Sequence, residues 1–116
     1  MNDRLSKISQ KAIDFRDERD WKQFHDPKNL AEAISIEAGE LLEKFLWMTT
    51  NESVSPEPDK KSEIKEEIAD IMIFLLYLCN SLDIDLVEAV EEKIKINSKK
   101  YPVEKARGTH KKYKEF

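Results

Sequence analysis

The sequence predicts an all-α protein, a helical bundle of four to five helices. Of its 116 residues, 40% are hydrophobic and 38% are charged, and only two are glycine and four are proline. This composition favours helices over the turn-rich strands of a β protein. Apolar residues also recur at alternating steps of three and four in several segments, which is the spacing of one helix face. The length suits one compact domain, so we expect a single domain over residues 1–116.

Two helices are expected in the first half of the chain. The first covers about residues 2–18, where apolar side chains repeat at helical spacing (Leu5, Ile8, Ala12 and Phe15). The second starts at Pro27, because Asp26 can cap a helix whose first residue is proline, and it should run to about Met48. The next segment, "TTNESVSPEPDKKS", is rich in Ser, Pro and charge and has no apolar period. We expect it to form an exposed loop.

Two further helices are expected in the second half. One runs from about Ser62 to Leu82, and nearly every residue of its stretch "IMIFLLYLC" is apolar. A helix buried almost all round usually needs a partner subunit in so short a chain, so we expect an obligate homo-oligomer. The last helix begins near Asp85, where "DLVE" resembles a capping box, and it stops before Pro102.

The chain lacks the features of a membrane or exported protein. Its start, "MNDRLSKISQ", is polar, and its longest apolar run is far shorter than the roughly 20 residues of a membrane span. We therefore expect a cytoplasmic protein that does not bind membranes. The single cysteine, Cys79, lies in the apolar run and is expected to be a small core residue.

The formal net charge of −4 conceals a basic segment. From Lys99 onward there are seven Lys or Arg residues against two Glu residues. Such a segment could bind a polyanion, either a nucleic acid or the phosphates of a nucleotide, or it could be a solvated flexible terminus.

Two pairs of carboxylates indicate a functional site. In "SIEAGELLEKFLW", Glu37 falls at the edge of the apolar helix face, and Glu40 follows three residues later. An unpaired buried carboxylate is strongly disfavoured, so such a group is normally protonated, paired or bound to a metal. The segment "EEIAD" repeats the spacing with Glu67 and Asp70, and the loop of about 14 residues between the helices permits antiparallel packing of the two pairs. Gly39, costly inside a helix, would be explained by close packing of a neighbouring helix.

Four carboxylates in one place need a counter-charge. An all-oxygen ligand set favours Mg²⁺ or Mn²⁺ over zinc, and magnesium usually shares its coordination sphere with substrate phosphates. The alternative is that the acids form solvated helix faces or pair with Lys44 and Lys65; two pairs on facing helices make us favour the metal site.

Two other groups of residues complement the acids. A stripe on the last helix could bind phosphates, and it comprises Lys93, Asn97, Lys100 and Tyr101. An aromatic group lies on both sides of the first acidic pair in sequence and could stack on a base, and it comprises Trp21, Phe24, His25 and Trp47. Solvated lysines and core aromatic residues are the plain alternatives.

Several motifs together resemble a known family. The segments "ERDW", "QFH", "GELLE", "FLW", "KEEIADIMIFLLYL" and "KKYP" are similar to the MazG-like all-α nucleoside triphosphate pyrophosphohydrolases, and most similar to the dCTP pyrophosphatase branch, over roughly residues 12–113. The resemblance implies a helical bundle completed by dimerisation, with dimers commonly paired into tetramers. It implies these Mg²⁺ ligands: Glu37, Glu40, Glu67 and Asp70. It also implies a base and sugar pocket at Trp21–His25, Trp47 and Phe74, and phosphate contacts from Lys93, Asn97, Lys100 and Tyr101.

The resemblance implies hydrolysis of a nucleoside triphosphate to a monophosphate and pyrophosphate, with Mg²⁺ as cofactor, dCTP or a modified dCTP as substrate, and nucleotide-pool sanitation as the role. Glu40 is our choice for the group that orients or deprotonates water. Three residues depart from the family pattern and bear on base preference: Phe74 replaces a tyrosine, Lys100 replaces an arginine, and Ala12 stands about where vertebrate relatives have a histidine.

Other functions stay open at this point. A related pyrophosphohydrolase could act on dUTP or phosphoribosyl-ATP. A non-catalytic module could bind a nucleotide, or its acids could bind another protein. Nucleic-acid binding through the basic segment is the reading we favour least, and we expect no nucleic-acid partner.

Overall fold

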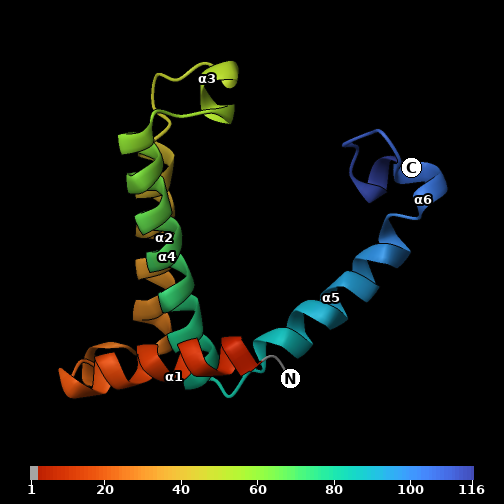
Figure 1. The fold of residues 1–116 in the computed structure, drawn as a ribbon. Coiled ribbons are helices and arrows are strands. Elements are labelled where there is room, and N and C mark those ends of the chain that lie inside the picture. The colour runs from red at the N-terminus through yellow and green to blue at the C-terminus, as the bar shows by residue number, and fades with distance from the viewer. Residues whose placement is uncertain (1–2) are drawn as a thin grey trace. The chain divides into compact units, whose positions relative to one another are not determined.

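The computed structural model describes residues 3–116, and all regular elements in that range are helices (Figure 1). The predicted all-α class is therefore confirmed. None of the described helices is both long and apolar enough to cross a membrane. The chain forms two compact units, one that ends at Ile84 and one that spans Asp85–Phe116. We describe each unit by itself, and the single domain expected over residues 1–116 stays a prediction.

The first unit contains four α-helices and one short 3₁₀ helix. They are α1 (Asp3–Glu18), η1 (Lys22–Phe24), α2 (Pro27–Glu43), α3 (Thr50–Val54) and α4 (Pro58–Ser81). Helices α2 and α4 lie side by side and run in opposite directions, and α1 crosses them near one end (Figure 1). The predicted start of α2 is confirmed, because the Asp26 carboxylate accepts a hydrogen bond of 2.8 Å from the Asn29 N–H and Pro27 is the first helical residue.

A small core joins α1 and α2 to α4. Leu30 on α2 is 1% exposed, and Leu76 and Tyr77 on α4 are 6% and 3% exposed. The Tyr77 hydroxyl donates a hydrogen bond of 2.9 Å to the carbonyl of Ala12 on α1. A buried hydroxyl is costly without a partner, so this bond fixes how α1 lies against α4.

The expected loop over "TTNESVSPEPDKKS" is wrong in part. Helix α3 begins after Thr49, whose hydroxyl accepts from the Glu52 N–H while the Glu52 side chain accepts from the Thr49 N–H. This reciprocal capping box stabilises a short helix without an apolar stripe. Helix α4 starts at Pro58 rather than near Ser62, because proline is favoured in the first turn of a helix.

Helix α2 ends at Glu43 rather than near Met48, which corrects the predicted boundary. Beyond it the chain tightens into turns, in which the N–H groups of Lys44 and Phe45 bond to carbonyls three residues back. Trp47 has a φ of 69°, a left-handed conformation that a helix cannot contain. The turn thus places Trp47 outside the helix.

Exposed positions on α4 and α2 show how far these helices are covered within one chain. Ile68 is 55% exposed and Ile73 is 37% exposed, so α4 is not buried all round within the chain. Apart from its chain neighbours and the nearby backbone of α2, a Cβ atom added to Gly39 would meet no described atom within 4 Å. Close packing of a neighbouring helix within the chain therefore does not explain Gly39. The partner subunit expected to cover these surfaces stays a prediction.

The second unit consists of α5 (Leu86–Lys100), α6 (Val103–Ala106) and a 3₁₀ turn, η2 (Tyr113–Glu115). The predicted start of α5 is confirmed, because the Asp85 carboxylate accepts from the Glu88 N–H at 3.1 Å. The helix ends before Pro102, as expected. The basic segment after α5 contains α6 and η2, so it has short helical turns rather than being an unstructured tail.

Candidate active site

Three carboxylates converge between α2 and α4. Glu37 comes from α2, and Glu67 and Asp70 come from one face of α4. One oxygen from each residue lies within 4.8 Å of the others. The three-residue spacing puts Glu67 and Asp70 on the same side of α4, and the antiparallel packing brings Glu37 to them. We call these three residues the acidic cluster.

Among the described residues, no Lys or Arg forms an ion pair with the acidic cluster. The Oε2 atoms of Glu37 and Glu67 are buried and accept no hydrogen bond from the described residues. Ion pairs of the described chain do not join Lys44 or Lys65 to the cluster, so the alternative in which those lysines neutralise the acids is not found. Buried carboxylate oxygens without donors are costly. The donor set therefore fits a hard divalent cation, which would supply the missing charge.

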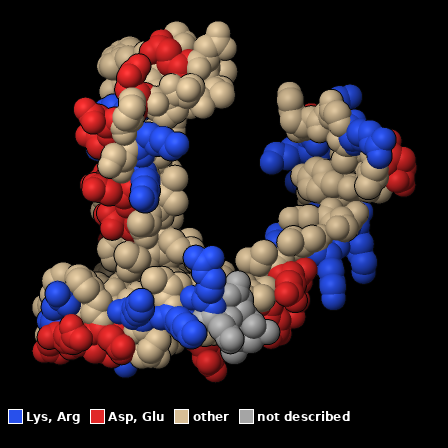
Figure 2. All heavy atoms as spheres, viewed as in Figure 1, with Lys and Arg blue, Asp and Glu red and all other residues tan. Residues whose placement is uncertain are grey.

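Electrostatics show the same need for a cation or a proton. The pKa of Glu37 is raised from 4.5 to about 7, first by its desolvation, then by hydrogen bonding to Glu67 and Glu40 and by repulsion from Glu40 and Asp70. Without a cation, a proton on Glu37 would remove this repulsion. Glu40 acts on the pKa of Glu37, although it is not one of the three converging residues. Figure 2 shows acidic side chains gathered along one side of the α2–α4 pair, which favours cations there.

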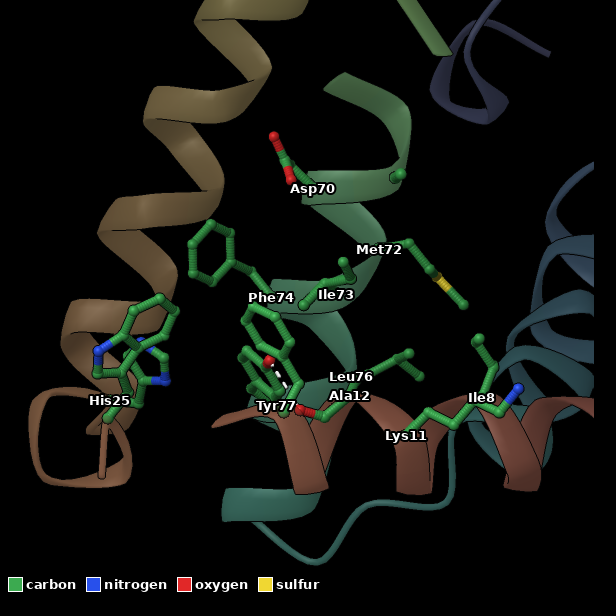
Figure 3. A pocket seen from close by; sticks show the side chains of 13 residues that line it. Ile8, Lys11, Ala12, His25, Asp70, Met72, Ile73, Phe74, Leu76 and Tyr77 are labelled. Carbon is green, nitrogen blue, oxygen red and sulfur yellow. Dashed lines mark hydrogen bonds between the residues drawn. The ribbon is translucent and has the colours of Figure 1, made fainter. Parts of the chain in front are cut away.

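A cavity of about 570 Å³ opens beside the acidic cluster. Residues of α1, of the turn around η1 and of α4 line it, and most of them are apolar. Asp70 belongs to both the cluster and the cavity lining. Figure 3 shows the side chains of Asp70 and Phe74 directed from α4 toward α2, with His25 near the start of α2. A cavity of this size and character can take a nucleoside.

His25 presents a neutral polar edge in this cavity. Its ring stacks on Tyr77, with centroids 5.2 Å apart and planes at 25°, and meets Phe74 edge-on at 6.1 Å. Burial and, second, the positive charge of Arg16 lower the pKa of His25. The Nδ1 atom is buried and has no hydrogen-bond partner among the described residues. A neutral imidazole has one donor and one acceptor, so His25 can read a base edge.

Sequence reasoning missed two residues behind His25, namely Arg16 and Tyr77. Arg16 is only 3% exposed; its Nε lies 2.9 Å from Asp17 Oδ1, and its guanidinium carbon lies 5.5 Å from the centroid of the Tyr77 ring. Both left a signal in the sequence, because Arg16 lies in "FRDERDW" and Tyr77 interrupts the apolar run "IMIFLLYLC". We call Arg16, Tyr77 and His25 the histidine stack.

The other expected site residues are distributed as follows. Trp21 lines the cavity and is 42% exposed, with its ring edge-on to Phe15 at 5.7 Å. Phe24, at 60% exposed, and Trp47, at 91%, are not among the cavity lining. The expected phosphate-binding residues lie in the second unit, on α5 or directly after it, and they are Lys93, Asn97, Lys100 and Tyr101. Their binding roles stay predictions.

Two antiparallel helices with three converging carboxylates beside an aromatic cavity define an all-α protein with an acidic site suited to a cation. The sequence model of the MazG-like family matches residues 33–116. Human dCTP pyrophosphatase 1 is 40% identical over 115 residues, which cover 97% of this chain and 67% of the human protein, and the mouse protein of the same name is 38% identical over 112 residues (94% and 65%). The chain belongs to the MazG-like family, as the sequence resemblance predicted.

A solved structure agrees with this assignment. The crystal structure of a pyrophosphatase from Archaeoglobus fulgidus is similar to this fold with a TM-score of 0.82 and 42% sequence identity, covering 88% of this chain and 95% of that chain. The chain spans about two thirds of the length of the curated relatives it matches.

Proposed function

We propose that the protein hydrolyses a nucleoside triphosphate between its α and β phosphates and releases a monophosphate and pyrophosphate. The observation that carries this proposal is the acidic cluster, which shares Asp70 with a nucleoside-sized cavity. The printed names of the relatives, dCTP pyrophosphatase 1 and pyrophosphatase, support the reaction and make dCTP or a modified dCTP the proposed substrate. Removal of such nucleotides from the pool is the proposed role.

The acidic cluster would hold Mg²⁺, or Mn²⁺ in its place, with Glu40 beside it as a fourth carboxylate. The unpartnered buried oxygens of Glu37 and Glu67 support this assignment. A bound divalent cation would offset the charge of the phosphates and lower the pKa of bound water. Ligation requires ionised carboxylates, so Glu37 would give up the proton that its raised pKa favours.

The remaining residues would orient the substrate. The rings of Trp21, Phe74 and Tyr77 would enclose the base, and the neutral imidazole of His25 would hydrogen-bond to its edge. Asp70 lies where the cavity meets the cluster, so the phosphates would begin there. Glu40, which helps to raise the pKa of Glu37 without joining the three converging oxygens, stays our choice for orienting or deprotonating the attacking water.

The stripe of Lys93, Asn97, Lys100 and Tyr101 would bind the phosphates of the substrate. We propose a dimer or a dimer of dimers, supported by exposed apolar side chains on α2 and α4 such as Ile36, Leu42 and Ile68. The expected cytoplasmic location stays a prediction.

A product assay tests the proposal. The protein is incubated with Mg²⁺ and each canonical dNTP, and in parallel with dUTP and with phosphoribosyl-ATP, and nucleotide and phosphate products are separated and quantified. We expect equimolar monophosphate and pyrophosphate, with dCTP the best substrate. Release of orthophosphate alone would contradict the reaction; binding of nucleotide without product would favour a non-catalytic module; and faster turnover of dUTP or phosphoribosyl-ATP would favour the related enzymes.

A further inference from the structure

An aromatic contact joins the basic segment to the end of α5. The ring of Tyr101 meets the ring of Tyr113 edge-on, with centroids 5.9 Å apart and planes at 83°. It meets Phe116 in the same way, at 5.8 Å and 88°. The Lys100 ammonium nitrogen lies 4.9 Å from the centroid of the Tyr113 ring. We call Tyr113 and Phe116 the aromatic clamp.

The chain returns to α5 through defined local structure. Tyr101 closes α5, since its N–H donates to the Asn97 carbonyl at 2.8 Å. Gly108 then has a φ of 74°, which glycine adopts without strain. The Lys112 N–H donates to Glu115 Oε2 at 2.8 Å, which stabilises the turn that carries Tyr113. The aromatic clamp is therefore held by local bonds, all of which lie inside the second unit.

The two residues that the clamp holds have the chemistry of phosphate contacts. Tyr101 offers a hydroxyl donor, and Lys100 offers an ammonium with three donors, so its contact with one ring face leaves donors for phosphate oxygens. Edge-to-face contacts and a cation–π contact restrict the side chains that make them. Side chains that are ordered before binding lose less conformational freedom when a ligand arrives.

We propose that Tyr113 and Phe116 are positioning residues for the substrate phosphates, which hold Lys100 and Tyr101 in the arrangement that receives them. The inference rests on the proposed function, in which Lys100 and Tyr101 contact the triphosphate. It assigns a role to residues 109–116, which neither the acidic cluster nor the cavity uses. It also explains why a basic segment, which could remain solvated, carries two aromatic rings against the end of α5.

Equilibrium binding of a non-hydrolysable dCTP analogue with Mg²⁺ tests the role of the clamp, with dCMP as the comparison ligand. Tyr113→Ala and Phe116→Ala should each weaken analogue binding about three- to tenfold, the range expected for losing one ordered cationic or aromatic contact. Binding of dCMP should stay the same, because a single phosphate does not need the whole phosphate site. In turnover, KM should rise while kcat stays within about twofold, since ground state and transition state lose the same contact.

Three further variants distinguish the loss of a ring contact from a folding defect and from the loss of a positive charge. Tyr113→Phe keeps the ring and should restore the affinity of the unsubstituted protein. Phe116→Leu keeps apolar volume without a ring, and it replaces Phe116→Ala if the alanine variant does not fold. Lys114→Met removes a positive charge from the same turn. The cation–π contacts of the described residues do not include Lys114, so this change should weaken analogue binding less than Tyr113→Ala.

The proposal is overturned if Tyr113→Ala and Phe116→Ala bind the analogue as tightly as the unsubstituted protein does. It is equally overturned if their affinity for dCMP falls by the same factor as their affinity for the analogue. It is also overturned if Lys114→Met has as large an effect as Tyr113→Ala, because charge alone would then account for binding. Failure of the proposed function is distinct, since the unsubstituted protein would then release no pyrophosphate from any dNTP.

Discussion

The acidic cluster and the histidine stack both contain residues of α4, but they differ in which of their buried polar atoms have partners. In the cluster, buried carboxylate oxygens of Glu37 and Glu67 have no partner among the described residues. In the stack, Arg16 pairs with Asp17 and the Tyr77 hydroxyl bonds to a carbonyl, so that the unpartnered atom is a nitrogen of a neutral imidazole. The comparison indicates that the cluster needs a cation or a proton to offset its negative charge, whereas the unpartnered atom of the stack belongs to an uncharged ring and needs only a hydrogen-bond partner.

The largest effect is expected for Glu37→Gln, which keeps the shape of the side chain and removes its charge. The variant should lose activity by about a hundredfold or more, because an ionised ligand of the proposed cation is gone. Its helical circular dichroism should be retained, since loss of a repelled carboxylate does not remove a core contact. The measurement is pyrophosphate release from dCTP.

The control for this change is Glu66→Gln. Glu66 is an exposed residue on α4 that lies outside the acidic cluster. It should keep the activity of the unsubstituted protein. Equal turnover in Glu37→Gln and the unsubstituted protein would show that Glu37 does not serve as a ligand.

A smaller effect is expected in the pH dependence of stability without metal. The pKa of Glu37 in the folded chain is about 7, above its ordinary value of 4.5. Between these values the folded state binds the proton more tightly than the unfolded state does. The stabilisation is therefore complete below about pH 4.5 and is lost as the pH rises through about 7.

Chemical denaturation in the presence of a chelator, at pH 5 and at pH 8, measures this loss. Glu37→Gln should show a weaker fall in the free energy of unfolding, because its amide does not titrate. Added Mg²⁺ should restore stability at pH 8, since it binds the ionised cluster of the folded state. If stability without metal were the same at both pH values for the two proteins, the cluster would not be electrostatically strained.

Sequence reasoning succeeded where the signal was local or periodic. Asp26 before Pro27 and Asp85 before α5 marked helix starts correctly, because a cap needs only neighbouring residues. Equal spacing of the acids on two helices, with a short connection, was enough to expect Glu37 beside Glu67 and Asp70.

Three features could not be predicted from the spacing of apolar and charged residues: helix α3, the position of Trp47 and the histidine stack. The capping box at Thr49 was present in the sequence, but the absence of an apolar period outweighed it. The position of Trp47 depends on a left-handed φ that nothing about tryptophan signals. The histidine stack depends on the angle at which α1 crosses α4 and on side-chain rotamers, so Arg16 and Tyr77 could not be placed from spacing alone.

The smallest effect is expected in the stack, for Tyr77→Phe. The change removes the hydroxyl that bonds to Ala12 at 2.9 Å and keeps the ring against His25. The free energy of unfolding should fall by about 1 kcal/mol, the net value of one hydrogen bond. Tyr113→Phe is the matched control, because the Tyr113 hydroxyl makes no hydrogen bond with the described residues and the residue is 41% exposed. Urea denaturation should show no loss of stability in this variant.

The same variant shows whether the stack is held together by its rings or by the hydroxyl. With the Tyr77 ring and the Arg16 charge kept, the pKa of His25 should stay below its ordinary value, because burial and Arg16 cause the shift. A titration of His25 followed by NMR measures this directly. A rise of the His25 pKa to its ordinary value in Tyr77→Phe would mean that the hydroxyl bond to α1 keeps the cavity closed around the imidazole. The stack would then depend on one polar contact, as the acidic cluster would depend on the proposed cation.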